Sequence, residues 1–180
     1  MEALLTFIWR FVLELWPWTI VDKWELGLRV RLGYRLTPLE PGPRVSLPFI
    51  DTILTEPSTL QTANLTDQTV ITSDGVNASV GGVIYYHVEN LKQLWEKVDD
   101  HEEALSNLAL TALAGQLAGR KFENCNLEEI QLATQHKIRD VAEDWGIHID
   151  GFELTDLCKS QVVRLMASEG NQTLVLGAEE

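Results

Sequence analysis

The side chains that could carry acid–base, nucleophilic or metal chemistry are few in this sequence, and they stand singly. The four histidines are His87, His101, His136 and His148. Catalytic and metal-binding motifs need two or more such groups at a fixed spacing, and no His-Glu-x-x-His, Cys-x-x-Cys or Gly-x-Ser-x-Gly arrangement occurs. The sequence therefore predicts a protein that is not an enzyme, with no catalytic residue, no metal ligand, no cofactor and no small-molecule substrate.

The two cysteines, Cys125 and Cys158, lie far apart and have no paired spacing. This pattern is typical of free thiols in a reducing compartment and does not indicate a disulfide framework. Both also lie far from the apolar start of the chain, so we do not expect either thiol to carry a lipid.

The overall charge of the chain excludes one class of partner. The formal net charge is −13 and the isoelectric point is about 4.6. Proteins that bind nucleic acid neutralise phosphates with clusters of Lys and Arg, and such clusters are absent here. We therefore expect no nucleic-acid partner.

Basic residues near the start of the chain could instead bind lipid phosphates. Residues 1–44 hold six Lys and Arg against five Asp and Glu, whereas the rest of the chain holds eight against twenty-two, so the net charges are +1 and −14. An anionic leaflet would repel the second part and not the first; the alternative is that the acidic surface only maintains solubility. The candidates for binding lipid headgroups are Lys23, Arg29, Arg31, Arg35 and Arg44. The alternative is that these side chains only lie on solvated faces of strands.

The first eighteen residues predict the element that would bring these cations to a membrane. The polar residues Glu2, Thr6, Arg10 and Glu14 recur every four positions in an otherwise apolar segment. In a helix, steps of four drift by only about 40°, so these residues form one narrow stripe and the rest a broad apolar arc. Pro17 should end the helix after about 15 residues, or about 22 Å, which is shorter than a hydrocarbon core of about 30 Å. The predicted membrane-anchoring residues are Leu4, Leu5, Phe7, Ile8, Trp9, Phe11, Val12, Leu13, Leu15, Trp16 and Trp18.

This segment is expected to lie in the membrane interface or to dip partway into the bilayer. Its tryptophans, together with Trp24, are of the type that prefers the headgroup boundary. Glu2 stands where a secretory signal would carry basic residues, so we do not expect cleavage. The alternatives are a spanning segment that continues to Val21 and a helix buried in the core. The predicted location is thus the membrane, monotopic or peripheral, with the domain on the cytoplasmic side because basic residues follow the helix.

Strands are predicted to follow the apolar segment. Residues 23–35 have the pattern of one strand, and the Pro-Gly turn at 40–44 leads to a second strand over 45–50 that should lie against the first. A longer hairpin joins residues 68–72 to 76–88 through an Asp-Gly turn, and the even-numbered residues of its second strand should face the core.

Helices come next, because the apolar period changes from two to about 3.6 after Asn90. We expect helices over 91–98 and 105–117, and a third that begins at Asn126 with Glu129 completing a capping box. Gly115 and Gly119 indicate close packing of the helix on the sheet or the end of the helix, and a contact between subunits is the less favoured alternative. A final strand should start at Ile147 after the stop at Gly146, with a bulge at Gly151. Strands, helices and a last strand predict an α+β fold.

These landmarks resemble the SPFH domain, also called the prohibitin-homology or band-seven domain, over about residues 21–157. The most specific match is Thr72–Val76 followed by Val83–Asn90, which is similar to the family's Thr-x-Asp-Gly-Val hairpin. Further segments that match in order and spacing are Gly27–Gly33, Pro41–Pro43, Leu47–Asp51, Leu117–Gly119, Leu127–Ile130, Trp145–Ile149 and Glu153–Asp156.

The resemblance implies a stomatin-like, membrane-associated scaffold that forms homo-oligomers, organises membrane microdomains and regulates partner membrane proteins. The alternative is a monomeric or small-oligomer adaptor that binds and modulates a membrane protease or channel. We expect a membrane-associating helix over residues 1–20, an SPFH domain over 21–158 and a short tail over 159–180. Only about twenty residues follow Asp156 where the family usually continues into a long coiled coil, so assembly should depend more on the faces of the domain.

Overall fold

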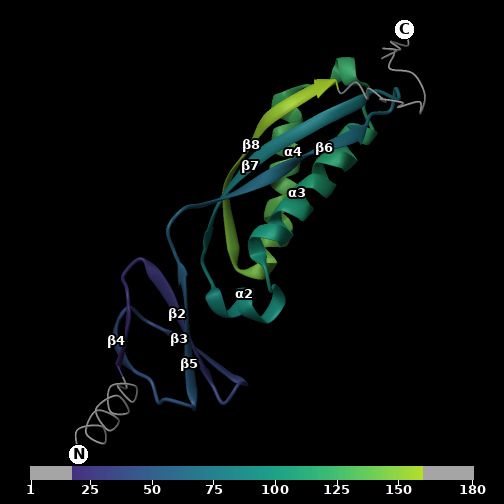
Figure 1. Cartoon of the computed structure of the whole chain (residues 1–180). Coiled ribbons are helices and arrows are strands. Elements are labelled where there is room, and N and C mark those ends of the chain that lie inside the picture. The colour runs from purple at the N-terminus through teal and green to yellow at the C-terminus, as the bar shows by residue number, and fades with distance from the viewer. Residues whose placement is uncertain (1–17, 160–180) are drawn as a thin grey trace, which may run out of the picture.

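A computed structural model describes residues 18–159 of the chain, and it has the predicted α+β architecture of antiparallel sheets and packed helices (Figure 1). We call residues 18–57 the N-terminal module and residues 61–159 the helical layer. The strands of the module are β1 (Trp18–Val21), β2 (Glu25–Arg31), β3 (Arg35–Leu39), β4 (Gly42–Val45) and β5 (Asp51–Pro57). The elements of the helical layer are β6 (Gln61–Ile71), β7 (Asn77–Val88), α2 (Leu91–Lys97), α3 (His101–Ala118), α4 (Leu127–Ala142) and β8 (Ile147–Lys159), with short 3₁₀ turns at Phe122–Asn124 and Glu143–Trp145.

The N-terminal module differs from the two-strand prediction. Residues 23–35 do not form one strand, because the chain turns at Leu32 and Gly33, which both have positive φ angles, and β3 returns alongside β2. The predicted strand over 45–50 is also wrong. Residue 45 ends β4, which pairs with β1, and the backbone N–H groups of Ile50 and Asp51 both donate to the carbonyl oxygen of Leu47, so residues 47–51 form a turn. Strand β5 then pairs with β2 on its other side, in the order β3-β2-β5.

The second sheet has the order β6-β7-β8. The predicted hairpin is confirmed, although its first strand begins at Gln61 and not at residue 68. The turn between β6 and β7 contains Gly75 at φ +78°, and the carboxylate of Asp74 accepts from the Thr72 hydroxyl and from the backbone N–H of Phe122. The even-numbered side chains of β7 face the core, as predicted. The buried ones are Ala78, Val80, Ile84, Tyr86 and Val88.

Strand β8 carries the predicted bulge and a second one. Tyr85 lies opposite Gly151 and Tyr86 opposite Ile149, so one extra residue is inserted beside Gly151. The second bulge lies at Thr155, opposite the step from Gly81 to Gly82, and no feature of the apolar alternation indicated it. Bulges strengthen the local twist of a strand, and the long β7–β8 ribbon is visibly twisted in Figure 1.

Helices α3 and α4 cover one face of the second sheet, where α3 packs on β6 and α4 packs on β8 (Figure 1). Helix α2 contacts β2 and β3, so the core continues from the helical layer into the module. Leu28 of β2 and Leu91 and Leu94 of α2 belong to the same buried cluster. The N-terminal module and the helical layer thus share one hydrophobic core.

The helix ends follow the predicted signals with two corrections. Helix α3 begins at His101, earlier than the predicted residue 105, because the Asp100 side chain caps it. The side chain of Asn126 accepts from the N–H of Glu128, but Glu129 does not complete a capping box, because its carboxylate pairs with Arg120 at 2.9 Å. Gly119 is the C-cap of α3, as one of the alternatives predicted, whereas Gly115 lies within the helix. Within residues 18–159, no helix is both long and apolar enough to cross a membrane.

The turn from the last 3₁₀ segment into β8 depends on Gly146. This residue has φ +80°, and a Cβ atom added there would lie 2.6 Å from the carbonyl oxygen of Asn90. Its own carbonyl oxygen accepts from the N–H groups of Glu89 and Asn90, both at 3.0 Å. The end of β7, the start of α2 and the start of β8 therefore meet at this glycine.

Replacing Gly146 by Ala should lower the free energy of unfolding by about 1–3 kcal/mol or more, because a left-handed backbone and a backbone clash coincide at this position. Gly119→Ala is a matched control, since Gly119 has a right-handed helical conformation and open space around its Cα atom. Urea unfolding monitored by circular dichroism measures both variants. Equal stabilities of the two variants would contradict the assigned role of Gly146.

Candidate membrane-facing surface

Large apolar side chains are exposed mainly on the N-terminal module. Nine such residues fall within the first 33 described positions, whereas the remaining residues up to 159 contribute six, so the density on the module is several times higher. Such a concentration of exposed apolar side chains makes the module a candidate for contact with a membrane or a protein. On the module they are Trp18, Ile20, Trp24, Leu32, Tyr34, Val45, Leu47, Phe49 and Ile50; elsewhere they are Leu60, Ile71, Trp95, Leu127, Leu132 and Val141.

Two turns place apolar side chains at one end of the module. Leu32 follows β2 and Phe49 precedes β5, and the N–H of Leu32 donates to the carbonyl oxygen of Ile50 at 2.8 Å, so the two turns are neighbours. Leu32 is 63% exposed and Phe49 is 94% exposed. Because β5 runs from this end toward the connection with β6, the two turns lie at the end of the three-stranded sheet that is distant from the helical layer.

The backbone of both turns is strained. Leu32 has φ +53° and Phe49 has φ +70°, which bulky residues rarely adopt. A strained backbone persists where neighbouring contacts hold it, and such residues cluster at functional sites. An exposed Phe in a left-handed conformation contributes little to folding, so the two turns are the strongest candidates for a contact surface.

An ion pair between Arg31 and Asp51 holds the two turns together. Nε and Nη2 of Arg31 donate to the two carboxylate oxygens at 2.7 and 3.0 Å, and the N–H of Leu47 donates to Oδ2 at 3.2 Å. The hydrogen bond from Arg31 is the main reason that the pKa of Asp51 falls to about 2, and the Leu47 N–H and the charges of Arg31 and Arg29 act in the same direction. The side chain of Asp51 has no exposed surface. This carboxylate is therefore structural.

The five headgroup candidates occupy different environments. Arg31 is committed to Asp51, and Arg44 donates to the carbonyl oxygen and carboxylate of Glu40 at 3.0 and 3.3 Å. Arg29 is half-buried, and its buried Nε has no hydrogen-bond partner among the described residues. Lys23 and Arg35 are exposed, and Arg35 lies directly across the strand pair from Arg31. The lipid-binding role of all five stays a prediction.

Of the predicted anchoring residues, those from Leu4 to Trp16 lie outside the described residues. Trp18 is on β1 and is 55% exposed. A helix that continues to Val21 is wrong, because Trp18–Val21 form β1. Trp24, in the turn before β2, is 58% exposed. Two tryptophans therefore lie on the surface of the N-terminal module.

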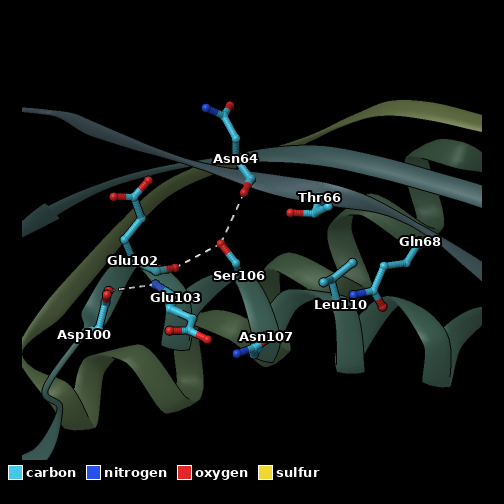
Figure 2. A pocket seen from close by; sticks show the side chains of 9 residues that line it. All are labelled: Asn64, Thr66, Gln68, Asp100, Glu102, Glu103, Ser106, Asn107 and Leu110. Atoms are coloured by element: carbon cyan, nitrogen blue, oxygen red, sulfur yellow. Dashed lines mark hydrogen bonds between the residues drawn. The ribbon is translucent and has the colours of Figure 1, made fainter.

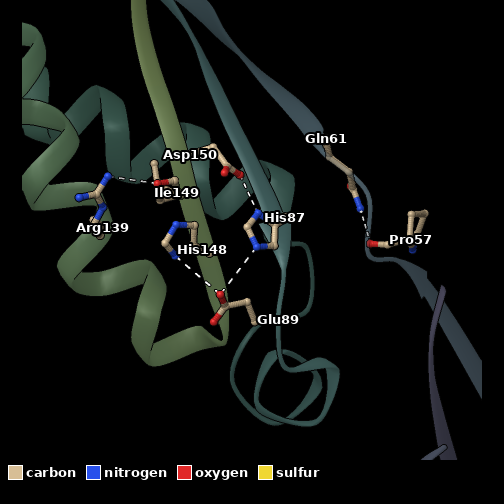
Figure 3. Close-up of polar contacts among 8 residues, drawn as sticks. All are labelled: Pro57, Gln61, His87, Glu89, Arg139, His148, Ile149 and Asp150. Carbon is tan, nitrogen blue, oxygen red and sulfur yellow. Dashed lines mark hydrogen bonds and ion pairs between the residues drawn. The ribbon is translucent and has the colours of Figure 1, made fainter. Parts of the chain in front are cut away.

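Two of the histidines that stand singly in the sequence lie side by side in the fold. The pairing of β7 with β8 places His87 directly opposite His148, and Glu89 and Asp150 complete a polar cluster (Figure 3). The two histidines are far apart in the sequence, and only the strand register could have revealed the pair. His101 and His136 lie elsewhere, on α3 and α4.

The helical layer also has an open polar cavity of about 350 Å³ between β6 and α3 (Figure 2). The hydroxyl of Ser106 donates to the carbonyl oxygens of Glu102 and Asn64, and the Asp100 side chain accepts from the N–H of Glu103. These groups support the helix and the strand edge, so we assign no ligand to this cavity. Both cysteines are free thiols, as predicted, and burial raises the pKa of Cys125.

Comparisons with known proteins agree with the fold. The model of the SPFH domain / Band 7 family matches residues 19–173. The chain is 30% identical to stomatin of Mus musculus over 83% of its own length and 55% of that protein, and 29% identical to stomatin-like protein 3 of Homo sapiens over 95% of its length and 61% of that protein. It is also 29% identical to an uncharacterized protein of Methanocaldococcus jannaschii, over 77% of this chain and 70% of that protein. The chain thus spans little more than half of the stomatins that it matches.

The Arg31–Asp51 pair predicts a specific dependence of stability on pH. Because the pKa of Asp51 in the folded protein is about 2, below the ordinary 3.8, the ionised carboxylate contributes stability that is fully present above pH 3.8 and is lost as the pH falls toward 2. Asp51→Asn should be less stable than the wild type at pH 7, and the difference should shrink over this interval. Urea unfolding at several pH values, followed by tryptophan fluorescence, measures it.

The matched control for this prediction is Glu40→Gln, which removes an exposed carboxylate from the same module. This variant should keep the slope of stability against pH that the wild type shows. An Asp51→Asn variant with the same slope as the wild type would show that the ion pair does not hold the turns.

Proposed function

The chain belongs to the SPFH domain / Band 7 family, and on that premise we propose that it is a membrane-associated, non-catalytic scaffold that assembles with copies of itself and organises the membrane and partner membrane proteins around it. The observation that carries the proposal is the concentration of exposed apolar side chains on the N-terminal module. The similarity to stomatins supports the same function class.

In this proposal the two strained turns enter the headgroup region. Phe49, Leu32 and Tyr34 are the most exposed apolar residues near the turns, and full burial of one such side chain contributes about 1.5–3 kcal/mol. Insertion also explains why bulky residues stand where glycine would relieve strain. Lys23 and Arg35, both exposed, would add roughly 1 kcal/mol each near an anionic leaflet.

The charge distribution supports one orientation of the domain. Residues 1–44 carry a net charge of +1 and residues 45–180 a net charge of −14, so an anionic surface repels the second part of the chain, which contains the whole helical layer, and tolerates the first. We assign residues 1–20 to the membrane-associating segment, 21–158 to the SPFH domain and 159–180 to a short tail. The excess of basic residues after the apolar segment favours the cytoplasmic side.

Assembly would use the faces of the domain. Strands β6 and β8 are the two edges of the second sheet within the described residues, and unpaired strand edges can pair with another chain. The edge of β8 is partly occupied, because Arg139 donates to the carbonyl oxygen of Ile149 at 3.3 Å. The β6 edge carries a comparable contact, since the Ser106 hydroxyl donates to the carbonyl oxygen of Asn64 at 3.3 Å. The remaining parts of both edges and the outer faces of the helices are the surfaces to test for contacts between copies.

Vesicle flotation with mixed neutral and anionic lipids tests the membrane contact. Deleting residues 2–17 should remove most of the binding, and Phe49→Ser in the shortened chain should weaken the residual binding by roughly tenfold, because one apolar side chain is no longer buried. Leu60→Ser is the matched control, since Leu60 is 60% exposed outside the module. If the shortened chain floats as well as the full chain, residues 2–17 are not the anchor.

Light scattering coupled to size exclusion of the full chain in mild detergent tests assembly. A scaffold should give a discrete species of many subunits, well above the 20.3 kDa of one chain. A monomer would contradict the scaffold proposal and favour the alternative, an adaptor that binds and modulates one membrane protease or channel. The wild-type chain alone distinguishes the two hypotheses. As a control, the mass of bound detergent must be subtracted from the mass that light scattering gives.

A further inference from the structure

Three arginines lie on one face of the three-stranded sheet of the N-terminal module, next to the two strained turns. Residues opposite each other on paired strands share a sheet face, and Arg31 of β2 lies between Arg35 of β3 and Asp51 of β5. Arg29 precedes Arg31 by two residues, so it lies on the same face. Thr37 of β3 is opposite Arg29, which makes Arg29 and Arg35 diagonal neighbours. Long side chains at diagonal positions can reach a common ligand.

The carboxylate on this part of the face is already committed to other donors. Asp51 accepts from Nε and Nη2 of Arg31 at 2.7 and 3.0 Å and from the N–H of Leu47 at 3.2 Å. Arg29 lowers the pKa of Asp51 through its charge alone, without a hydrogen bond. Three guanidinium charges and one carboxylate charge leave a net charge of +2 at this end of the sheet. The chain as a whole has a net charge of −13, so this end of the module stands out as a positive patch.

Arg29 brings a charge that is only partly solvated. Its Nε is buried and has no hydrogen-bond partner among the described residues, although the residue as a whole is half-buried. Strand β1 covers the adjoining part of the same face, since the side chain of Val21 lies 3.0 Å from the position that a Cβ atom on Gly27 would take. A guanidinium group stays charged, and a buried charge without a partner costs free energy. An anion on this face would therefore stabilise Arg29.

Arg35 adds a second cation that a ligand can reach. It is exposed, and it lies directly across the strand pair from Arg31. Like charges that face each other across two strands destabilise a sheet. An anion bound between Arg29 and Arg35 would offset this repulsion and the desolvation of Arg29 together.

We propose that Arg29 and Arg35 form a binding site for one phosphomonoester group. Such a group carries a charge of about −1.5 to −2 at pH 7 and has three acceptor oxygens. Two planar guanidinium groups can each donate a pair of hydrogen bonds to it, and the shielded Nε leaves the Nη groups of Arg29 as the donors. A phosphodiester or a carboxylate carries a single negative charge, so it balances less of the positive charge on the face.

The position of the site favours a lipid headgroup as the source of the phosphomonoester. Arg31 and Arg35 flank the turn that carries the exposed Leu32. When that turn enters the headgroup region, Arg35 lies at the level of the lipid phosphates. On this point the inference rests on the proposed membrane contact. A soluble phosphomonoester offers the same charge and the same oxygens, so the experiment has one arm for each source.

Equilibrium dialysis of the full chain in mild nonionic detergent, with radiolabelled inorganic phosphate, tests the site without a membrane. We expect saturable binding of one phosphate per chain. Arg35→Gln should weaken the affinity by roughly tenfold or more, because charge-assisted hydrogen bonds are lost. Arg35→Lys should also bind more weakly than the wild type, since it keeps the charge but not the planar fork of donors. Lys23→Gln is the matched control, because Lys23 is an exposed cation of the same module, and it should bind as the wild type does.

Two further measurements keep this test independent of folding. Arg29→Gln should also weaken binding by roughly tenfold or more, and circular dichroism shows whether the half-buried position tolerates the change. Arg35 is exposed, so its variants decide the outcome if Arg29→Gln unfolds. Dimethyl phosphate, a phosphodiester, should compete with radiolabelled phosphate much less well than unlabelled phosphate does. Absence of saturable phosphate binding, or equal affinity in Arg35→Gln and the wild type, would overturn the proposal.

Flotation on phosphatidylcholine vesicles identifies the source of the group. One set of vesicles contains phosphatidic acid, a phosphomonoester, and the other contains the same fraction of phosphatidylglycerol, a phosphodiester. A lipid source predicts that the wild type binds the first set more strongly and that Arg35→Gln loses this preference. Phosphate binding without such a preference supports the site with a soluble ligand. A chain that binds phosphate but floats with neither set contradicts the membrane contact alone, so the two proposals can fail separately.

Discussion

Strand β7 is paired along nearly all of its length on both sides, and the rest of the helical layer depends on this double pairing. Its even-numbered side chains face α3 and α4, so the two helices find a continuous apolar surface to cover. Its odd-numbered side chains lie on the opposite face, which has no helix over it in Figure 1. The same register brings His87 beside His148, so the core on one face and the polar cluster on the other have a common origin.

The helical layer could be predicted from the sequence because its signals are local and repeated. The alternation from Val76 to Val88, the Asp74-Gly75 turn and the cap at Asn126 each determine their own segment. The histidine pair could not be predicted, because it depends on which residue of β8 lies opposite His87, and a bulge at Gly151 shifts that register. Glu129 shows a related limit: its spacing fits a capping box, but Arg120 offers a charged partner.

The N-terminal module was predicted less well for a physical reason. Its strands are short and thinly covered, so burial does not impose the clean alternation that a strand against a large core would show. The run from Val45 to Ile50 looked like a strand because it is apolar, yet Leu47, Phe49 and Ile50 are exposed. Apolar residues that do not serve the core, held in a turn by Asp51, are consistent with a surface that the proposed membrane contact would cover. The headgroup candidates were chosen by type and position, which does not reveal that Arg31 and Arg44 already have acidic partners.

The shared core around helix α2 has a mechanical consequence. Leu28 of the module is buried in the same cluster as Leu91 and Leu94, and Gly146 ties the start of α2 to the start of β8. The module cannot pivot freely against the long sheet, because such a pivot would expose these leucines to water. The N-terminal module and the helical layer of the elongated domain in Figure 1 therefore move together as one rigid unit. The angle at which the module contacts a surface then sets the position of the far end of the helical layer. Neighbouring copies that contact the same surface through the N-terminal module would therefore all hold their helical layers at the same angle to that surface.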